Sequence, residues 1–75
     1  MNAQRRKQLN AAIAKIEEAK IDIESLQSEE QEAFDNMPES IQCGDRGQAM
    51  EQTADALQQA VDELENTLHD LTGIE

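Results

Sequence analysis

Hydrophobic residues recur at helical spacing in two long segments of the chain, separated by a short stretch that contains glycine and proline. In the first segment the spacings are three, four or seven residues, which is the period of one face of an α-helix. The residues that follow this period are Leu9, Ile13, Ile16, Ile23 and Leu26, with Ala12, Ala19 and Ala33 in the same stripe. Most residues between them are good helix formers. A first helix is therefore predicted.

The second segment has a stricter pattern, in which spacings of four and three alternate without a break. Its apolar positions are Met50, Ala54, Leu57, Val61, Leu64, Leu68 and Leu71. Alternation of this kind over nearly three heptads keeps one face of a helix against a partner helix. The sequence predicts a second, coiled-coil-like helix.

Glycine and proline set the limits of these helices. Pro38 disfavours helical geometry at the residue before it, so the first helix is expected to span about residues 3–36. A hinge at 37–44 follows, and a second helix at about 45–72, with Gly73 as its C-terminal cap. Asp45 and Gln48 have the spacing of a capping box, in which the Asp side chain accepts from the Gln48 amide. So short a link allows only an antiparallel hairpin, and the fold class predicted is all-α.

The apolar stripe of the first helix is too wide for one partner helix to cover. Ile13 and Phe34 are expected to flank the line through Leu9, Ile16 and Ile23. We therefore expect self-association into a four-helix bundle or a larger homo-oligomer. The expected oligomer seam consists of Leu9, Ile16, Ile23, Leu57, Val61, Leu64, Leu68 and Leu71.

Length and charge agree with this architecture. The chain has 75 residues, enough for one small domain, and a net charge of −11. Residues 1–20 carry a net charge of +3 and residues 21–75 a net charge of −14. An antiparallel hairpin places the basic segment beside Asp62, Glu63, Glu65 and Asp70. So acidic a protein is not expected to bind nucleic acid directly, although it can imitate a nucleic-acid backbone.

The chain offers little for catalysis, and we expect it not to be an enzyme. His69 is the only histidine and Cys43 the only cysteine, and no base stands beside either at a recognisable spacing. Asp62, Glu65 and His69 share a helix face, but a solvated polar face explains them, so we expect no metal and no cofactor. No apolar run is long enough for a membrane span and no signal peptide is apparent, which favours a cytoplasmic protein.

Two regions are candidates for binding. The first is an acidic face formed by Asp55, Asp62, Glu63 and Glu65. The second is the hinge, where a helix start and a guanidinium could hold a phosphate. The candidate binding residues, which lie on either side of this hinge, are Phe34, Asn36, Asp45, Arg46 and Gly47. Alternatively, Arg46 pairs with Asp35 or Glu39 and the glycines only permit the turn.

The segments EEQEAFDNMPESIQ (29–42) and DRGQAME (45–51) resemble a group of short, acidic, two-helix proteins of phages and prophages. In that group an acidic helix runs into a turn like Phe34-Asp35-Asn36-Met37-Pro38-Glu39, followed by an Arg-Gly pair and a second amphipathic helix. The match covers about a third of the chain. The resemblance implies a phage origin and a cytoplasmic place in an infected or lysogenic bacterium, more than it implies a mechanism.

Small phage proteins without catalytic residues commonly bind a host protein stoichiometrically. By that analogy we expect an acidic helical interaction protein that inhibits a host protein such as a defence or nucleic-acid-acting system, with acidic mimicry as one way of doing so. One alternative is an oligomeric sponge that sequesters a nucleotide signal through Arg46 and the hinge. Another is a structural component of a phage assembly.

Overall fold

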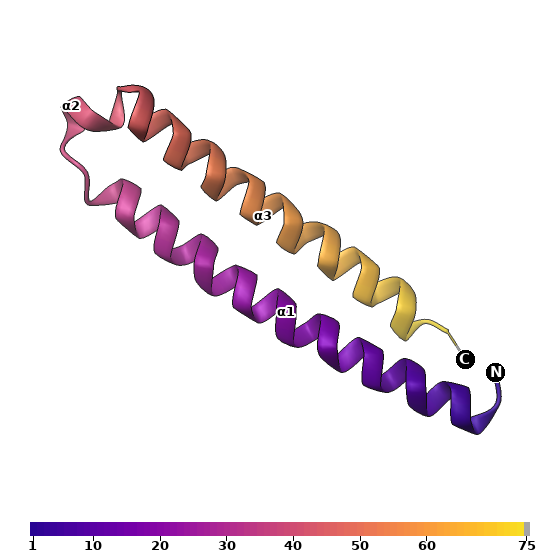
Figure 1. The fold of residues 1–75 in the computed structure, drawn as a ribbon. Helices are drawn as coiled ribbons and strands as arrows, with labels where there is room; N and C mark the ends of the chain where they lie inside the picture. The colour runs from indigo at the N-terminus through magenta and orange to yellow at the C-terminus, as the bar shows by residue number, and fades with distance from the viewer. Residues whose placement is uncertain (75) are drawn as a thin grey trace.

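The computed structural model describes residues 1–74 of the chain, and they form an antiparallel helical hairpin (Figure 1). Helix α1 spans Ala3–Asp35, the short helix α2 spans Glu39–Gln42, and helix α3 spans Asp45–Thr72. The two long helices pack along their length, and the chain ends lie together at the end opposite α2 (Figure 1). The expected all-α hairpin is thus confirmed.

Helix α1 begins and ends where the sequence signals lie. Asn2 is its N-cap, and the Asn2 side chain accepts a hydrogen bond from the Arg5 amide at 2.8 Å. The helix ends at Asp35, three residues before Pro38. Its open carbonyls are partly satisfied from the hinge, because Gln42 Nε2 donates to the carbonyl of Phe34 at 2.9 Å. This bond fixes α2 against the end of α1.

The region expected to be a simple hinge contains the single helical turn α2, with Pro38 as its N-cap. Proline suits this position because it lacks the amide that the first turn would leave unpaired. Four residues are too few for a hydrophobic period, which is why the pattern did not indicate this helix.

The expected capping box at the start of α3 is wrong. The N-cap is Gly44, with φ −89° and ψ −179°, and no side chain caps the helix. Asp45 is already the first helical residue, so its carboxylate lies in the first turn, where it interacts favourably with the helix dipole. Gly73 is the C-cap of α3 as expected, in right-handed geometry with φ −79°.

Burial follows a heptad pattern in both long helices. We label as a the line through Ile13, Lys20, Gln27 and Phe34 on α1 and through Gly47, Ala54, Val61 and Leu68 on α3. The d line passes through Leu9, Ile16, Ile23 and Glu30 on α1 and through Met50, Leu57, Leu64 and Leu71 on α3. The five residues that are buried within residues 1–74, namely Ile13, Gly47, Ala54, Val61 and Leu68, all occupy a positions, whereas every residue of the d line is only partly buried. The a line therefore faces the partner helix, and the d line is turned toward one side of the hairpin.

The core of the hairpin is thin. Its buried hydrophobic residues are Ile13, Ala54, Val61 and Leu68. Ile13 was expected at the flank of the stripe and is instead the one buried residue of α1. Leu26, expected within the stripe, is 54% exposed. The stripe was misplaced because the true a line of α1 carries the polar residues Lys20 and Gln27, which the hydrophobic pattern passes over.

Candidate functional site

The hairpin has two long edges of different chemistry. One, which we call the polar edge, follows the heptad positions beside the a line. Its residues are Glu17 and Glu24 on α1 and Glu51, Asp55, Gln58, Asp62 and Glu65 on α3. The other, which we call the apolar edge, lies on the side of the d line. Its exposed margin consists of Ala12, Ala19, Leu26 and Ala33 on α1 and of Thr53 and Thr67 on α3, with the partly buried Ala60 between the two threonines.

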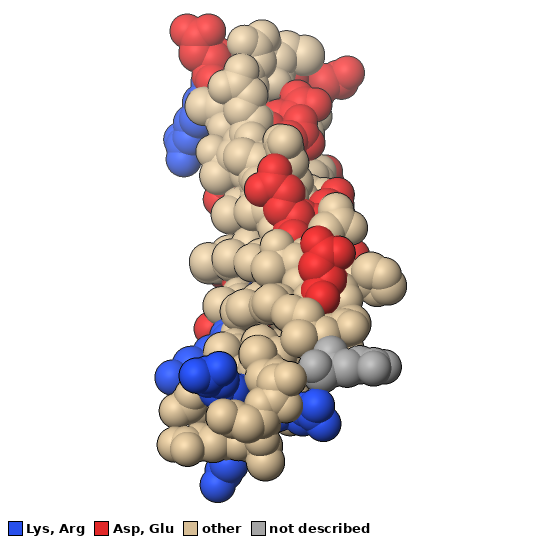
Figure 2. All heavy atoms as spheres, turned by 90° about the vertical axis from the view of Figure 1, so that its right-hand side faces the viewer, with Lys and Arg blue, Asp and Glu red and all other residues tan. Residues whose placement is uncertain are grey.

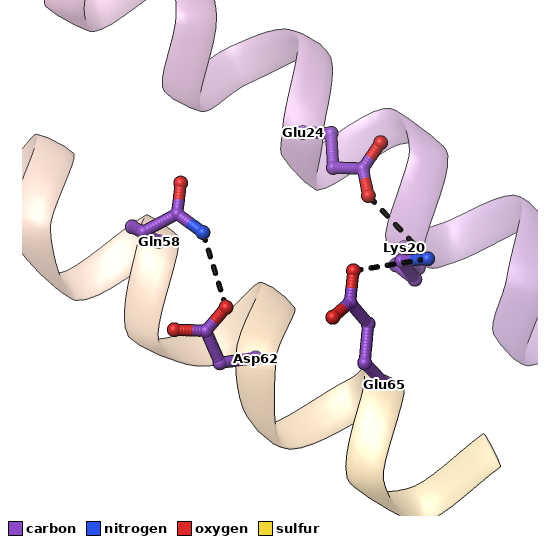
Figure 3. A network of polar contacts seen from close by, with 5 residues as sticks. All are labelled: Lys20, Glu24, Gln58, Asp62 and Glu65. Carbon is purple, nitrogen blue, oxygen red and sulfur yellow. Dashed lines mark hydrogen bonds and ion pairs between the residues drawn. The ribbon is translucent and has the colours of Figure 1, made fainter. Parts of the chain in front are cut away.

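A lysine ties the two helices together at the polar edge (Figure 3). Lys20 Nζ lies 3.5 Å from Glu24 Oε1 on its own helix and 3.4 Å from Glu65 Oε1 on α3. These are the two ion pairs within residues 1–74. Lys20 takes an a position with its stem along the interface and its ammonium turned out to the carboxylates, as long basic side chains commonly do. The bridge to Glu65 joins α1 to α3.

The surroundings of Lys20 raise the pKa of its ammonium above the usual 10.5. Partial burial acts to lower this pKa, but the hydrogen bond and charge of Glu65, together with those of Glu24, outweigh it. A raised lysine pKa means that the folded chain holds this proton more tightly than the unfolded chain. The resulting stabilisation is present below about pH 10.5 and is lost as the pH rises through the raised pKa.

We therefore expect Lys20→Met to be less stable than the wild type at pH 8, by an amount that shrinks above pH 10.5. Urea unfolding at intervals between pH 8 and 12 measures this, and no tyrosine titrates in the range because the chain has none. Lys15→Met is the control, since Lys15 is exposed and forms neither ion pair. A constant difference between wild type and Lys20→Met up to pH 12 would contradict the assignment.

The structure places most of the expected acidic face on the polar edge. Asp55, Asp62 and Glu65 lie along the same side of α3, and Asp62 Oδ1 accepts from Gln58 Nε2 at 3.1 Å (Figure 3). Glu63 is exposed but belongs to the side of α3 that adjoins the apolar edge. The acids of this edge that sequence reasoning missed, Glu17, Glu24 and Glu51, follow the same heptad spacing. That spacing could have identified them once Lys20 was recognised as an a residue.

Charge is separated along the length of the hairpin. Figure 2 shows most of the basic residues in view at one end of the molecule, one basic side chain near the other end, and acidic residues along the face between them. The basic end is that of the chain termini, where Arg5, Arg6 and Lys7 lie. Of the four acids expected beside the basic segment, Glu65 forms an ion pair with it, through Lys20. Most of the hairpin therefore presents unpaired carboxylates to solvent.

The candidate residues around the hinge differ in their exposure. Asn36, Asp45 and Arg46 are exposed, whereas Phe34 is partly buried in the a line and Gly47 is buried. Neither of the expected pairings of Arg46, with Asp35 or with Glu39, is formed. Asp35 instead accepts a hydrogen bond from Gln31 Nε2 at 3.1 Å.

Gly47 has a structural role at the hinge. The backbone of Gln42 passes so close that a Cβ on Gly47 would lie 2.6 Å from the Gln42 Cα and would overlap its carbonyl oxygen. Glycine at this position allows α2 to fold back against the first turn of α3. Glycine at this position is therefore needed for the turn.

Other candidate chemistry is dispersed. Cys43 is exposed at the end of α2, and His69 is exposed on α3. The side chains described, residues 1–74, include neither a group of His, Cys, Asp and Glu placed to hold a metal ion nor an enclosed pocket. Glu65, one of the three residues weighed for a metal, faces Lys20 instead.

Within residues 1–74 neither long helix has a stretch apolar enough to traverse a bilayer. Comparison of the sequence with protein-family models gives no match, and comparisons with curated proteins and with solved structures give none either.

Proposed function

We propose that this chain is a non-enzymatic interaction protein whose polar edge binds a basic surface of another protein. The observation that carries the proposal is the polar edge itself, where carboxylates from both helices line one side of a rigid rod 58 Å long. Acidic side chains held in a row attract and orient a basic partner through their combined field. The resemblance to short acidic phage proteins favours a host protein as this partner, with inhibition as the outcome.

The spacing of the acids argues for a protein partner. Along α3, Glu51, Asp55, Asp62 and Glu65 are separated by four, seven and three residues, or roughly 6, 10 and 5 Å of helix axis. Duplex DNA carries one charge per about 1.7 Å, so a single polar edge is much sparser than a nucleic-acid backbone. Such spacing suits a discrete cluster of Lys and Arg side chains. Mimicry of a duplex would need the acids of more than one hairpin.

We further propose that the chain self-associates, in the simplest case as two hairpins in a four-helix bundle. The thin core supports this, because four buried hydrophobic residues are few for a domain of 75 residues. The alternative of a nucleotide sponge has less support, since Arg46 and Asp45 are exposed side by side on α3 and an adjacent carboxylate opposes a phosphate.

The test is capture of host proteins on immobilised wild type and on the variant Glu51→Gln/Asp55→Asn/Asp62→Asn, read by mass spectrometry. This variant leaves the Lys20 bridge intact. We expect the wild type to retain a host protein that is released as salt rises from about 0.1 to 0.5 M, because screening shortens the reach of exposed charges. We expect the triple variant not to retain this protein.

The matched control is Asp22→Asn/Glu29→Gln/Asp70→Asn, which removes the same charge from positions off the polar edge. Retention of the host protein by this control, but not by the triple variant, assigns binding to the polar edge. Equal loss with both variants would show that net charge alone governs retention, and the proposal would then be wrong.

A further inference from the structure

The apolar edge of the hairpin is left unpartnered. The large aliphatic residues of the d line, among them Leu9, Ile16, Ile23, Leu57 and Leu64, are only partly buried by the opposite helix. Beside them on α1 lie Ala12, Ala19, Leu26 and Ala33, all exposed. The two helices therefore present an apolar strip along one side of the rod, interrupted on α1 by Glu30.

The pattern on α1 is that of a bundle helix. A two-stranded coiled coil needs apolar residues only at a and d, whereas a helix in the core of a bundle adds a third position beside them. On α1 the third position is occupied by alanine or leucine at four successive heptads. On the polar edge the equivalent positions hold glutamate, glutamine and asparagine. The sequence thus places a third row of apolar residues on the apolar edge and not on the polar edge.

The hairpin exposes more accessible surface than a compact monomer of the same mass. The hairpin has an accessible surface of 5634 Å², whereas a compact monomer of 8.4 kDa is expected to have about 4,600 Å². Its radius of gyration is 17.2 Å against about 11 Å for a compact domain of this length. The excess area, on the order of 1,000 Å², matches the roughly 800 Å² that each partner buries in a standard stable interface. One copy packed along the strip would remove it.

The distribution of charge indicates that the apolar edge is the face on which a second copy of the chain can pack. The chain carries a net charge of −11, so two copies repel each other over most of their surface. The d line and the exposed margin of the apolar edge together contain one acid, Glu30, while Arg5 and Arg46 stand at their two ends. The apolar edge is thus the side where like chains can approach closely. The small alanines also permit a short distance between helix axes.

We infer that the apolar edge is the docking surface for a second copy of this chain. Two hairpins pack edge to edge about a two-fold axis into a four-helix bundle, and their polar edges remain outside. The inference rests on the proposed self-association and specifies its face. It also explains why the polar edge stays available to a basic partner.

The test compares two exposed aliphatic residues of α1. Leu26, 54% exposed, lies on the apolar edge, whereas Ile21, 62% exposed, lies on the opposite side of the helix. Wild type, Leu26→Glu and Ile21→Glu are studied as pure full-length chains by sedimentation equilibrium from about 1 to 200 µM. Helicity is followed by circular dichroism.

Wild type and Ile21→Glu are expected to approach twice the 8.4 kDa chain mass at 200 µM, with dissociation constants within threefold of each other. Leu26→Glu is expected to dissociate at least 100-fold more readily, because a carboxylate would be buried without a partner. Ala19→Arg is the second variant, since a long charged side chain replaces an exposed alanine without removing any contact within the hairpin.

A wild type that is monomeric and helical at 200 µM would overturn the inference. Equal weakening by Leu26→Glu and Ile21→Glu, or a dimer unaffected by both Leu26→Glu and Ala19→Arg, would also overturn it. These outcomes are independent of the proposed function, because capture of a host protein by the polar edge is measured separately and does not require the bundle.

Discussion

Replacing Gly47 with alanine is expected to destabilise the hairpin by about 2–3 kcal/mol, the cost typical of forcing extra atoms into a filled site. Helix propensity alone predicts the opposite, because alanine in a helix interior is better than glycine by roughly 1 kcal/mol. We expect Gly47→Ala to lower the unfolding free energy despite this propensity, because the backbone of Gln42 lies so close to Gly47. A Cβ on Gly47 would meet the Cα, carbonyl carbon and carbonyl oxygen of Gln42, and backbone atoms cannot move aside as a side chain can.

The other two glycines serve as matched controls. A Cβ on Gly73 would lie 3.5 Å from the nearest backbone oxygen, and on Gly44 it would lie 3.4 Å away, both ordinary contacts. Both residues have negative φ values that any amino acid adopts. We expect Gly73→Ala to be neutral or stabilising by up to about 1 kcal/mol. Gly44→Ser is expected to stabilise slightly, because serine can cap α3 where no side chain does so now.

Urea unfolding of the three variants, followed by circular dichroism at 222 nm, gives the comparison. If Gly47→Ala unfolds at the same urea concentration as the wild type, α2 does not pack on α3 as described. The separation between Gly47→Ala and Gly73→Ala is the informative quantity, since both replace a glycine with alanine in the same chain.

The two long helices were predictable to different degrees from sequence. The heptad of α3 is visible because all of its d positions are large and apolar, and from Ala54 onward its a positions are apolar too. In α1 the same heptad passes through Lys20, Gln27 and Glu30. A stripe predicted from hydrophobic residues alone therefore includes Ala12 and Leu26, which lie on the apolar edge and not on the a line. Extending the four-three spacing from Leu9 without regard to polarity would have placed Lys20 in the interface.

The start of α3 could not be settled from sequence. Asp is favourable both as an N-cap and in the first turn, and only the backbone conformation separates the two. Here the extended residue is Gly44, so Asp45 falls inside the helix. The contact between Gln42 and Gly47 was equally hidden, because it depends on how α2 folds back and on no residue pattern.

Leu68→Ala is expected to have the second large effect, a loss of about 2–3 kcal/mol, near the low end for a buried leucine because the core is thin. A domain of this size has a total stability of only about 4–11 kcal/mol, so the loss is a large fraction of it. Leu68 is 9% exposed and lies on the a line against α1. Truncating it removes apolar contact from the interface between the two long helices and leaves a cavity there.

Leu64, one turn earlier on α3, is the matched comparison because it is a partly buried leucine of the d line. In an isolated hairpin its truncation should cost only about 1 kcal/mol, since part of the side chain is already in water. In a bundle that buries the apolar edge, Leu64→Ala should approach the cost of Leu68→Ala. Urea unfolding of both variants at 2 and 200 µM distinguishes an isolated hairpin from a bundle. For an isolated hairpin, the difference in unfolding free energy between Leu68→Ala and Leu64→Ala is the same at both concentrations. For a bundle, this difference is smaller at 200 µM. If Leu68→Ala costs no more than Leu64→Ala at a concentration at which sedimentation shows the chain to be monomeric, the a line does not form the core of this hairpin.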